Sequence, residues 1–79
     1  MIAICALGWN KSDFTRRWLE SVQRNSAGHD VCLYLMDNGS TDDTSAIMQS
    51  FGPAYFQRNE ANESLYKGWN TLARRAIAD

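Results

Sequence analysis

The sequence has little of what several protein classes need. It contains one proline, one histidine and two cysteines among 79 residues. Its longest apolar run, Met1 to Leu7, is far shorter than the roughly 20 residues of a membrane-spanning helix. No positive residues precede this run and no small-residue cleavage site follows it, so a signal peptide is not indicated. We therefore expect a cytoplasmic chain without a membrane span.

An excess of positive charge is also missing. Eight Lys and Arg residues stand against nine Asp and Glu residues, and the net charge is -1. The longest basic runs are the pairs Arg16-Arg17 and Arg74-Arg75, and each pair lies in a segment of helical periodicity where it forms a solvated face. This balance argues against a nucleic-acid partner bound through bulk charge.

The few metal-ligating residues do not form a metal site. Cys5 and Cys32 lie inside apolar runs, where a thiol acts as a small buried hydrophobic group, and two cysteines lack the spacing of a zinc site or disulfide framework. His29 lies in a turn without a second ligand nearby. The pair Asp42-Asp43 fits the start of a helix better than a metal clamp. We predict no metal site.

What the sequence does contain is three apolar segments that alternate with three segments of helical periodicity. The predicted strands are residues 1–7, 31–36 and 54–56. We expect Ser12 to cap the first helix and the second helix to start at Ser40 or Thr41. The apolar stripes that should face the sheet are Phe14, Trp18, Leu19 and Val22; Ile47, Met48 and Phe51; and Leu65, Trp69, Leu72, Ala73, Ala76 and Ile77.

This alternation is typical of an α/β fold with a parallel sheet. We predict a single Rossmann-like β-α-β-α-β-α half-sheet over residues 1–79, with the strands in the order 3-2-1 and helices on both faces. The first strand reads as one covered on both faces, yet nothing in the sequence pairs with its other side. An open apolar edge favours association, so we expect either self-association or a partner chain to cover it.

Polar loops follow each predicted strand, and ligands bind at the carboxyl ends of strands in such sheets. Trp9 follows the first strand, where its ring either stacks on a base or covers the top of the sheet. Asp37 and Asn38 end the second strand. They either read a base or a ribose hydroxyl, or serve as turn and cap residues beside Gly39 and Ser40.

Glycine-rich phosphate motifs are absent from the first loop. A dinucleotide fingerprint needs three spaced glycines, and only Gly8 is present. A P-loop is missing as well. These absences disfavour NAD and FAD, and with them a reductase-like or methyltransferase-like Rossmann domain.

Two loops nevertheless resemble a known family. The segment from Asp37 to Asp42 reads Asp-Asn-Gly-Ser-Thr-Asp, and the segment from Leu7 to Asn10 reads Leu-Gly-Trp-Asn. Both are similar to the strand ends of the inverting family 2 glycosyltransferases, which have the GT-A fold. Asn62-Glu63-Ser64, with Asn70, resembles more loosely the entry to that family's third helix. The resemblance covers nearly the whole chain and implies the N-terminal half of a truncated GT-A domain.

The resemblance implies a nucleotide-sugar-binding half-domain, with a UDP-type donor expected first. Trp9 would pack on the base, and Asp37 with Asn38 would recognise the nucleoside. Leu7 stands where the family usually has proline, and Leu65 where many members carry a basic residue; Lys67 is nearby but out of register. The implied nucleotide-binding residues are Leu7, Gly8, Trp9, Asp37, Asn38 and Lys67.

The implied reaction is sugar transfer from a nucleotide-sugar to an acceptor hydroxyl. The family's Asp-x-Asp motif, which holds Mg²⁺ or Mn²⁺ on the sugar diphosphate, and its catalytic base would both lie beyond Asp79. We therefore expect no catalytic residue and no cofactor in this chain, and no transfer by the chain alone. The alternative is a non-enzymatic nucleotide-binding or assembly module derived from the same fold.

Overall fold

The computed structural model describes all residues from Met1 to Asp79 as one α/β layer structure. Its strands are β1 (Ile2–Gly8), β2 (Val31–Asp37) and β3 (Tyr55–Arg58), and its helices are α1 (Ser12–Asn25), α2 (Thr44–Ser50) and α3 (Leu65–Ala78). The three strands form one parallel sheet in the order β1-β2-β3. The predicted fold class and strand order are confirmed.

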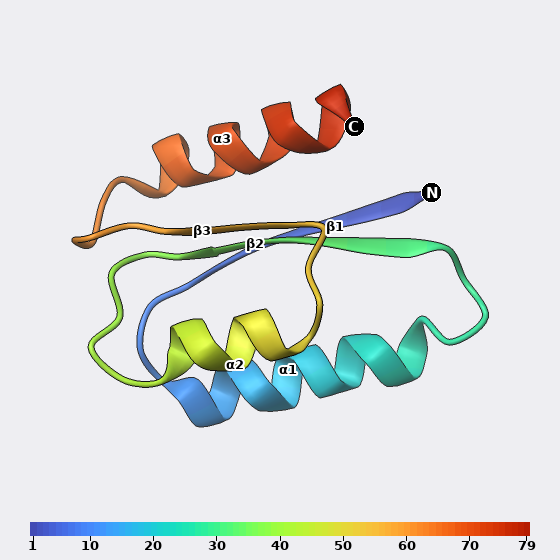
Figure 1. Cartoon of the computed structure of the whole chain (residues 1–79), viewed down its shortest axis with the longest axis horizontal. Coiled ribbons are helices and arrows are strands. Elements are labelled where there is room, and N and C mark those ends of the chain that lie inside the picture. The colour runs from blue at the N-terminus through green and yellow to red at the C-terminus, as the bar shows by residue number, and fades with distance from the viewer.

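The helices cover the two faces of the sheet. Figure 1 shows α1 and α2 together on one face and α3 alone on the other. Right-handed crossovers that proceed in one direction along a sheet place their helices on the same face, which explains the pairing of α1 with α2. Helix α3 follows the last strand and returns over β1 and β2, where Leu72 packs on Tyr34 and Met36.

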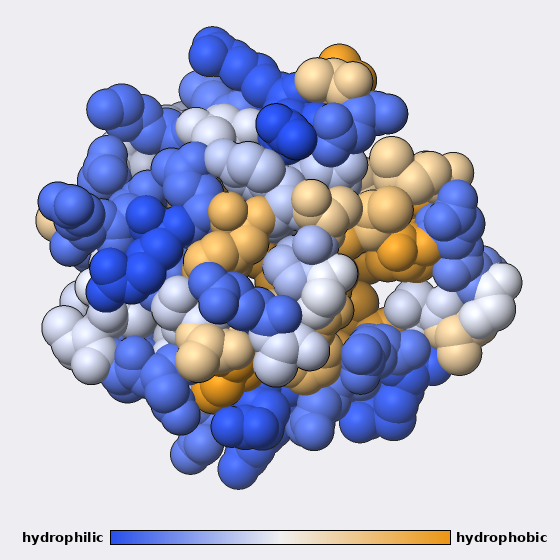
Figure 2. All heavy atoms as spheres, in the orientation of Figure 1, coloured by the Kyte–Doolittle hydropathy of each residue, from blue (hydrophilic) through white to orange (hydrophobic).

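The core is divided into two small clusters, one on each face. Leu19, Leu35 and Met48 pack below the sheet, while Tyr34, Met36 and Leu72 pack above it. All of the fully buried apolar side chains of the sheet therefore come from β2, the central strand. Figure 2 shows apolar atoms gathered between the helical layers, with hydrophilic atoms over the outer surfaces of the helices.

Strand β1 is less covered than its apolar sequence predicts. None of its residues is fully buried, and Ile2 is 52% exposed. The prediction of a strand covered on both faces is wrong for this chain because β1 is the terminal strand of the sheet. The same edge explains why Phe14 and Trp18, predicted to face the sheet, are 70% and 38% exposed.

The stripe on α3 is also only partly covered. Leu72 is fully buried, whereas Leu65 and Ile77 are 61% and 85% exposed. Gly68 lies where α3 packs closely on β1, because a Cβ added there would overlap the Leu7 side chain. The small residue therefore lets the helix settle onto the sheet.

Two predicted helix starts are wrong in position. Lys11, not Ser12, precedes α1, and no side chain of that residue caps the helix. Helix α2 begins at Thr44 rather than at Ser40 or Thr41. In both cases the reason is that the polar residues of the loop before α1 and of the loop before α2 hydrogen-bond to each other.

Candidate functional site

The register of the sheet aligns the carboxyl ends of all three strands. Gly8 of β1 pairs with Asp37 of β2, and Asp37 pairs with Arg58 of β3. The loops that follow these residues therefore leave the sheet at the same edge, as Figure 1 shows. We call this edge, with the loops 8–12, 37–43 and 58–64, the rim.

Asp37 is at the centre of the rim and is fully buried. Its Oδ1 accepts hydrogen bonds from the Ser40 backbone N–H at 3.1 Å and from the Ser40 hydroxyl at 2.5 Å. Its Oδ2 is buried and receives no hydrogen bond, although the Arg58 Nε lies 3.7 Å away. A buried carboxylate oxygen normally has a donor partner, so this oxygen has unused capacity to accept one.

Arg58 is the cation nearest to that oxygen. Its Nη2 donates to the backbone carbonyl of Ser40 at 3.1 Å, which holds the guanidinium beside the second loop. The Arg58 side chain is about half exposed while the Asp37 side chain is completely buried. The rim therefore presents a positive group on its surface with a carboxylate directly behind it.

Asn38 is 2% exposed and uses its whole side-chain amide within the protein. Its Nδ2 donates to the Asn62 Oδ1 at 2.7 Å and to the Glu63 carbonyl at 2.9 Å. Its Oδ1 accepts from the Asn59 Nδ2 at 3.0 Å and from the Glu63 N–H at 2.9 Å. An amide has two donors and two acceptor positions, so Asn38 is saturated and fixes the third loop to the sheet.

The first loop is fixed to the second by hydrogen bonds. Asn10 and Lys11 both have a left-handed backbone with φ of 56°. The Asn10 N–H donates to the Ser40 hydroxyl at 2.7 Å, and the Asn10 Oδ1 accepts from the Thr41 N–H at 2.9 Å. The amide of Asn10 offsets part of the cost of its unusual backbone, since Asn tolerates this conformation better than most residues.

Asp42 caps two helices at once. Its Oδ1 accepts from the Thr44 hydroxyl at 2.5 Å and from the Thr44 N–H at 3.0 Å, at the start of α2. Its Oδ2 accepts from the Ser12 N–H at 3.2 Å, at the start of α1. The Thr44 hydroxyl, and then the Thr44 N–H, lower the pKa of Asp42 from its usual 3.8. The cap of α1 is therefore supplied 30 residues later in the sequence.

The lowered pKa predicts how the two caps depend on pH. A carboxyl whose pKa is lower in the folded than in the unfolded chain stabilises the fold above its unfolded value and loses that effect as pH falls through its folded value. We expect Asp42→Asn to reduce the free energy of unfolding most at neutral pH, with the difference from wild type shrinking below pH 3.8. Urea unfolding across this range measures the difference. Asp43→Asn is the control, because Asp43 makes no capping hydrogen bond.

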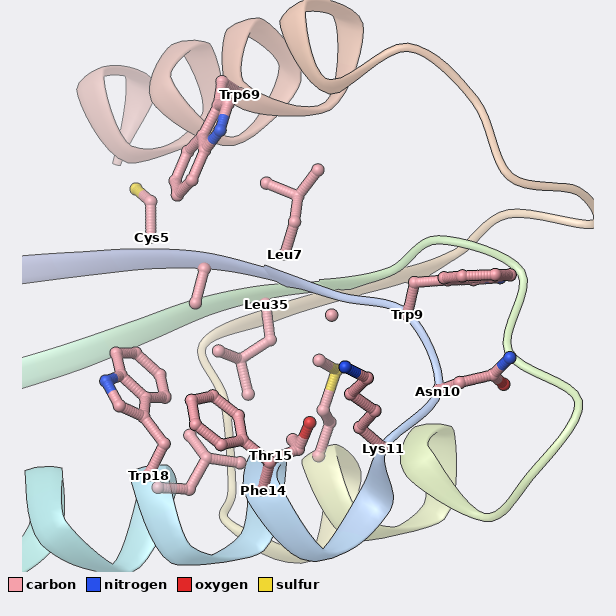
Figure 3. Close-up of a pocket in the computed structure, with 14 residues that line it drawn as sticks. Cys5, Leu7, Trp9, Asn10, Lys11, Phe14, Thr15, Trp18, Leu35 and Trp69 are labelled. Atoms are coloured by element: carbon pink, nitrogen blue, oxygen red, sulfur yellow. The ribbon is translucent and has the colours of Figure 1, made fainter.

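Trp9 is the most exposed of the predicted nucleotide contacts on the strands and their ends, at 52%. Figure 3 shows its ring extending from the end of β1, away from the helices, above Asn10. Leu7, Gly8 and Trp9 line one pocket of about 430 Å³ together with residues of α1. A Cβ at Gly8 would lie 2.5 Å from the Met48 Cε, so the glycine allows β1 to lie close to α2.

Lys67 lies apart from that group. It lines a second, polar pocket of about 180 Å³ with Gln57 and Asn59, and its Nζ lies 3.9 Å from the Glu63 Oε1. Asp37 and Asn38 line neither pocket. The structure thus aligns Gly8 with Asp37 at the rim, but places Lys67 on the α3 side of the sheet.

The sequence placed a polar loop after the third strand but did not predict which of its residues contact Asp37 and Asn38. Arg58, Asn59 and Asn62 all approach the Asp37-Asn38 pair through side-chain contacts. The available signal was positional, because Arg58 and Asn59 end the third strand as Asp37 and Asn38 end the second. The predicted third strand, residues 54–56, stopped too early to align them.

Three other findings bear on possible ligands and partners. No helix is long and apolar enough to cross a membrane. No three His, Cys, Asp or Glu side chains come together in a way that could hold a metal ion. Cys5 and Cys32 are both free thiols.

Comparison with known proteins gives one match. The model of the family described as glycosyl transferase family 2 matches residues 4–79. No curated protein and no solved structure matches the chain. The match includes the rim and all of the secondary structure except Ile2 and Ala3 of β1, and the parallel α/β half-sheet agrees with it. The chain therefore belongs to glycosyl transferase family 2.

Proposed function

We propose that the rim binds the nucleotide of a nucleotide-sugar donor, with a uridine diphosphate sugar as the first candidate. The chain would be the donor-binding portion of a glycosyltransferase whose whole reaction moves the sugar to an acceptor hydroxyl. The family match supports a glycosyltransferase-type chain. The observation that carries the nucleotide assignment is the buried Asp37 Oδ2, which has no hydrogen-bond donor.

The chemistry of this oxygen fits a nucleoside. A base N–H or a ribose hydroxyl could donate to Oδ2, and a hydrogen bond to a charged group is stronger than one between neutral groups. The half-exposed Arg58 side chain beside Oδ2 is the group whose displacement would admit such a donor. The Asp37 carboxylate remains in place during this exchange because Ser40 holds its other oxygen.

Trp9 supplies the apolar half of the proposed site. It follows Gly8, which pairs with Asp37 across the sheet, so an indole face and a carboxylate lie at neighbouring strand ends. A base could stack on the exposed ring while its polar edge reaches toward β2. Leu7 and Gly8 would support the tryptophan from below, whereas Asn38 would act by holding the third loop in position.

We assign no catalytic residue in this chain. A transfer reaction needs a base for the acceptor hydroxyl and a cation for the departing diphosphate. Asp37 Oδ2 is a single buried oxygen, and no three His, Cys, Asp or Glu side chains come together to complete a Mg²⁺ or Mn²⁺ site around it. We therefore propose that nucleotide binding here does not depend on metal. Lys67, on the α3 side, is the candidate contact for the diphosphate, since its side chain is 80% exposed.

Calorimetric titration with UDP, GDP and CDP, each with and without Mn²⁺, tests this proposal. We expect UDP to bind without a metal requirement, and Trp9→Ala to weaken it about tenfold, because stacking on an aromatic ring contributes about 1–3 kcal/mol per base. Asp37→Asn should weaken binding similarly, since it removes the charge while keeping an oxygen for Ser40. Trp18→Ala is the matched control, because Trp18 lies nearly two turns along α1 from the rim.

Unchanged affinity in both rim variants, with wild-type circular dichroism, would contradict the site assignment. The absence of nucleotide binding by a folded wild-type chain would favour the second candidate, a non-enzymatic assembly module. That candidate is supported by a different observation, the uncovered apolar edge of β1.

A further inference from the structure

The rim contains the pair Asn38-Gly39, in which an asparagine is followed directly by a glycine. Each of the other five asparagines of the chain precedes a residue with a side chain. A glycine has no Cβ to keep the preceding side chain away from its backbone nitrogen, so that nitrogen can attack the asparagine amide. Asn38 is therefore the asparagine of this chain whose amide is most prone to hydrolysis through a cyclic imide.

The fold requires both residues of this pair. Gly39 has a φ of 84°, and a Cβ there would lie 2.6 Å from the Ala61 carbonyl carbon. Asn38 is 2% exposed and makes four hydrogen bonds to residues of the third loop. Replacing either residue would disturb the rim, so the chain carries a chemically labile pair at the centre of its polar loops.

The hydrogen bonds of Asn38 also oppose the reaction. The Asn38 Nδ2 donates to the Asn62 Oδ1 and to the Glu63 carbonyl, and the Asn38 Oδ1 accepts from Asn59 and from the Glu63 N–H. Attack on the Asn38 Cγ makes this carbon tetrahedral and expels Nδ2, so it destroys the planar amide to which all four bonds are made. The reaction therefore needs residues 59–63 to move away from Asn38 first.

The attacking nitrogen, by contrast, is not held by a hydrogen bond. The Gly39 N–H donates to no other group of the protein, whereas the neighbouring Ser40 N–H donates to the Asp37 Oδ1 at 3.1 Å. The bonds that must break before the reaction are thus those of the Asn38 amide and not those of the Gly39 nitrogen. Opening of the third loop is the step that controls the rate.

We propose that Asn38 is a site of spontaneous deamidation whose rate is set by opening of the third loop. The Gly39 nitrogen gives its proton to water or hydroxide and bonds to the Asn38 Cγ; the Cγ–Nδ2 bond breaks, and Nδ2 takes a proton from water and leaves as ammonia. A second water then adds to one of the two carbonyls of the cyclic imide and opens the ring. The product is aspartate or isoaspartate at position 38.

Either product changes the rim permanently. A carboxylate has no N–H, so it cannot donate to the Asn62 Oδ1 or to the Glu63 carbonyl, and it adds a negative charge beside the buried Asp37. Isoaspartate also adds one backbone carbon between Asp37 and Ser40, whose N–H and hydroxyl bond to the Asp37 Oδ1. Deamidation therefore releases the third loop. The inference needs no ligand and does not depend on the proposed nucleotide site.

Peptide mapping by mass spectrometry at mildly alkaline pH tests the site, with chromatographic separation of aspartate from isoaspartate. We expect Asn38 to be the first asparagine to deamidate in the urea-unfolded chain. In the folded chain it should react about 100-fold more slowly, because local opening limits the rate. Slower reaction at Asn38 than at Asn25 in urea would overturn the site. Equal rates at Asn38 in the folded and unfolded chains would overturn its control by the third loop.

The variants Asn59→Ala and Asn62→Ala test the role of the third loop. Each removes one partner of the Asn38 amide, so deamidation at Asn38 in the folded chain should become about fivefold to tenfold faster. Asn70→Ala is the matched control and should leave the rate unchanged, because Asn70 is exposed on α3 and makes no hydrogen bond with Asn38. Equal rates in all three variants would overturn the proposal.

Amide hydrogen exchange of the wild type gives a second test that does not need any variant to fold. The Glu63 N–H bonds to the Asn38 Oδ1, so its exchange rate measures how often the third loop opens. At urea concentrations below the unfolding transition, deamidation at Asn38 should become faster in proportion to exchange at Glu63. Faster deamidation without faster exchange at Glu63 would show that loop opening does not control the reaction.

Discussion

Replacing Gly39 by alanine is expected to lower the free energy of unfolding by more than about 2 kcal/mol. Gly39 has a φ of 84°, and a left-handed backbone costs an L-residue about 1–2 kcal/mol. A Cβ there would also lie 2.6 Å from the Ala61 carbonyl carbon and 2.9 Å from the Asn62 nitrogen. Both neighbours are backbone atoms, so they cannot rotate away.

This loss is large for a chain of 79 residues, whose whole stability is on the order of 4–12 kcal/mol. Urea unfolding of Gly39→Ala measures it. Gly28→Ala is the matched control, because Gly28 has nearly the same φ, 85°, but a Cβ there would meet nothing within 4 Å. Equal losses in the two variants would show that the contact with Ala61 is unimportant.

Replacing Asn38 by alanine is expected to cost about 2–4 kcal/mol. The substitution removes four hydrogen bonds, each with a net contribution of about 1 kcal/mol, from a side chain that is almost fully buried. It also frees the third loop, so residues 59–63 should become more sensitive to proteolysis than in the wild type. Denaturant unfolding and limited proteolysis measure the two effects separately.

Asn25→Ala is the control for this substitution. Asn25 is an exposed asparagine that makes one hydrogen bond, from its Nδ2 to the Ser21 hydroxyl at 3.3 Å. Its replacement should change the free energy of unfolding by no more than about 0.5 kcal/mol. A loss at Asn38 as small as this would mean that water replaces its partners, and that the loop is held by other contacts.

The sequence predicted the sheet well because the main strands can be identified from their own residues alone. The runs of apolar residues in β1 and β2 need no knowledge of the rest of the chain, and right-handed crossovers then fix the strand order. The extent of burial could not be predicted in this way. The spacing of Phe14 and Trp18 indicates which face of α1 is apolar, but not that the sheet ends at β1 above them.

The motif from Asp37 to Asp42 shows where local reasoning stops. The sequence predicted either turn and cap roles or nucleoside recognition for its residues, and the structure shows that each of them has different hydrogen-bond partners. Asp37 pairs with Ser40 inside the motif, whereas Asn38 bonds to residues 21 to 25 positions later and Asp42 bonds to Ser12, 30 positions earlier. Those partners are set by the register of the sheet, and no spacing within the motif reveals them.

The parallel register also determines when the sheet can form. Ile2 pairs with Val31, and Tyr34 pairs with Tyr55, so no strand pair can begin as a tight hairpin. Isolated helical turns form within about a microsecond, whereas such distant pairings wait for long loops to close. At about 5–20 residues per second, a ribosome needs roughly 1.5 to 6 seconds to make the segment from Ile2 to Val31. During that interval β1 is an unpaired apolar segment of the nascent chain. It can pair with a strand and become buried only after β2 has been synthesised.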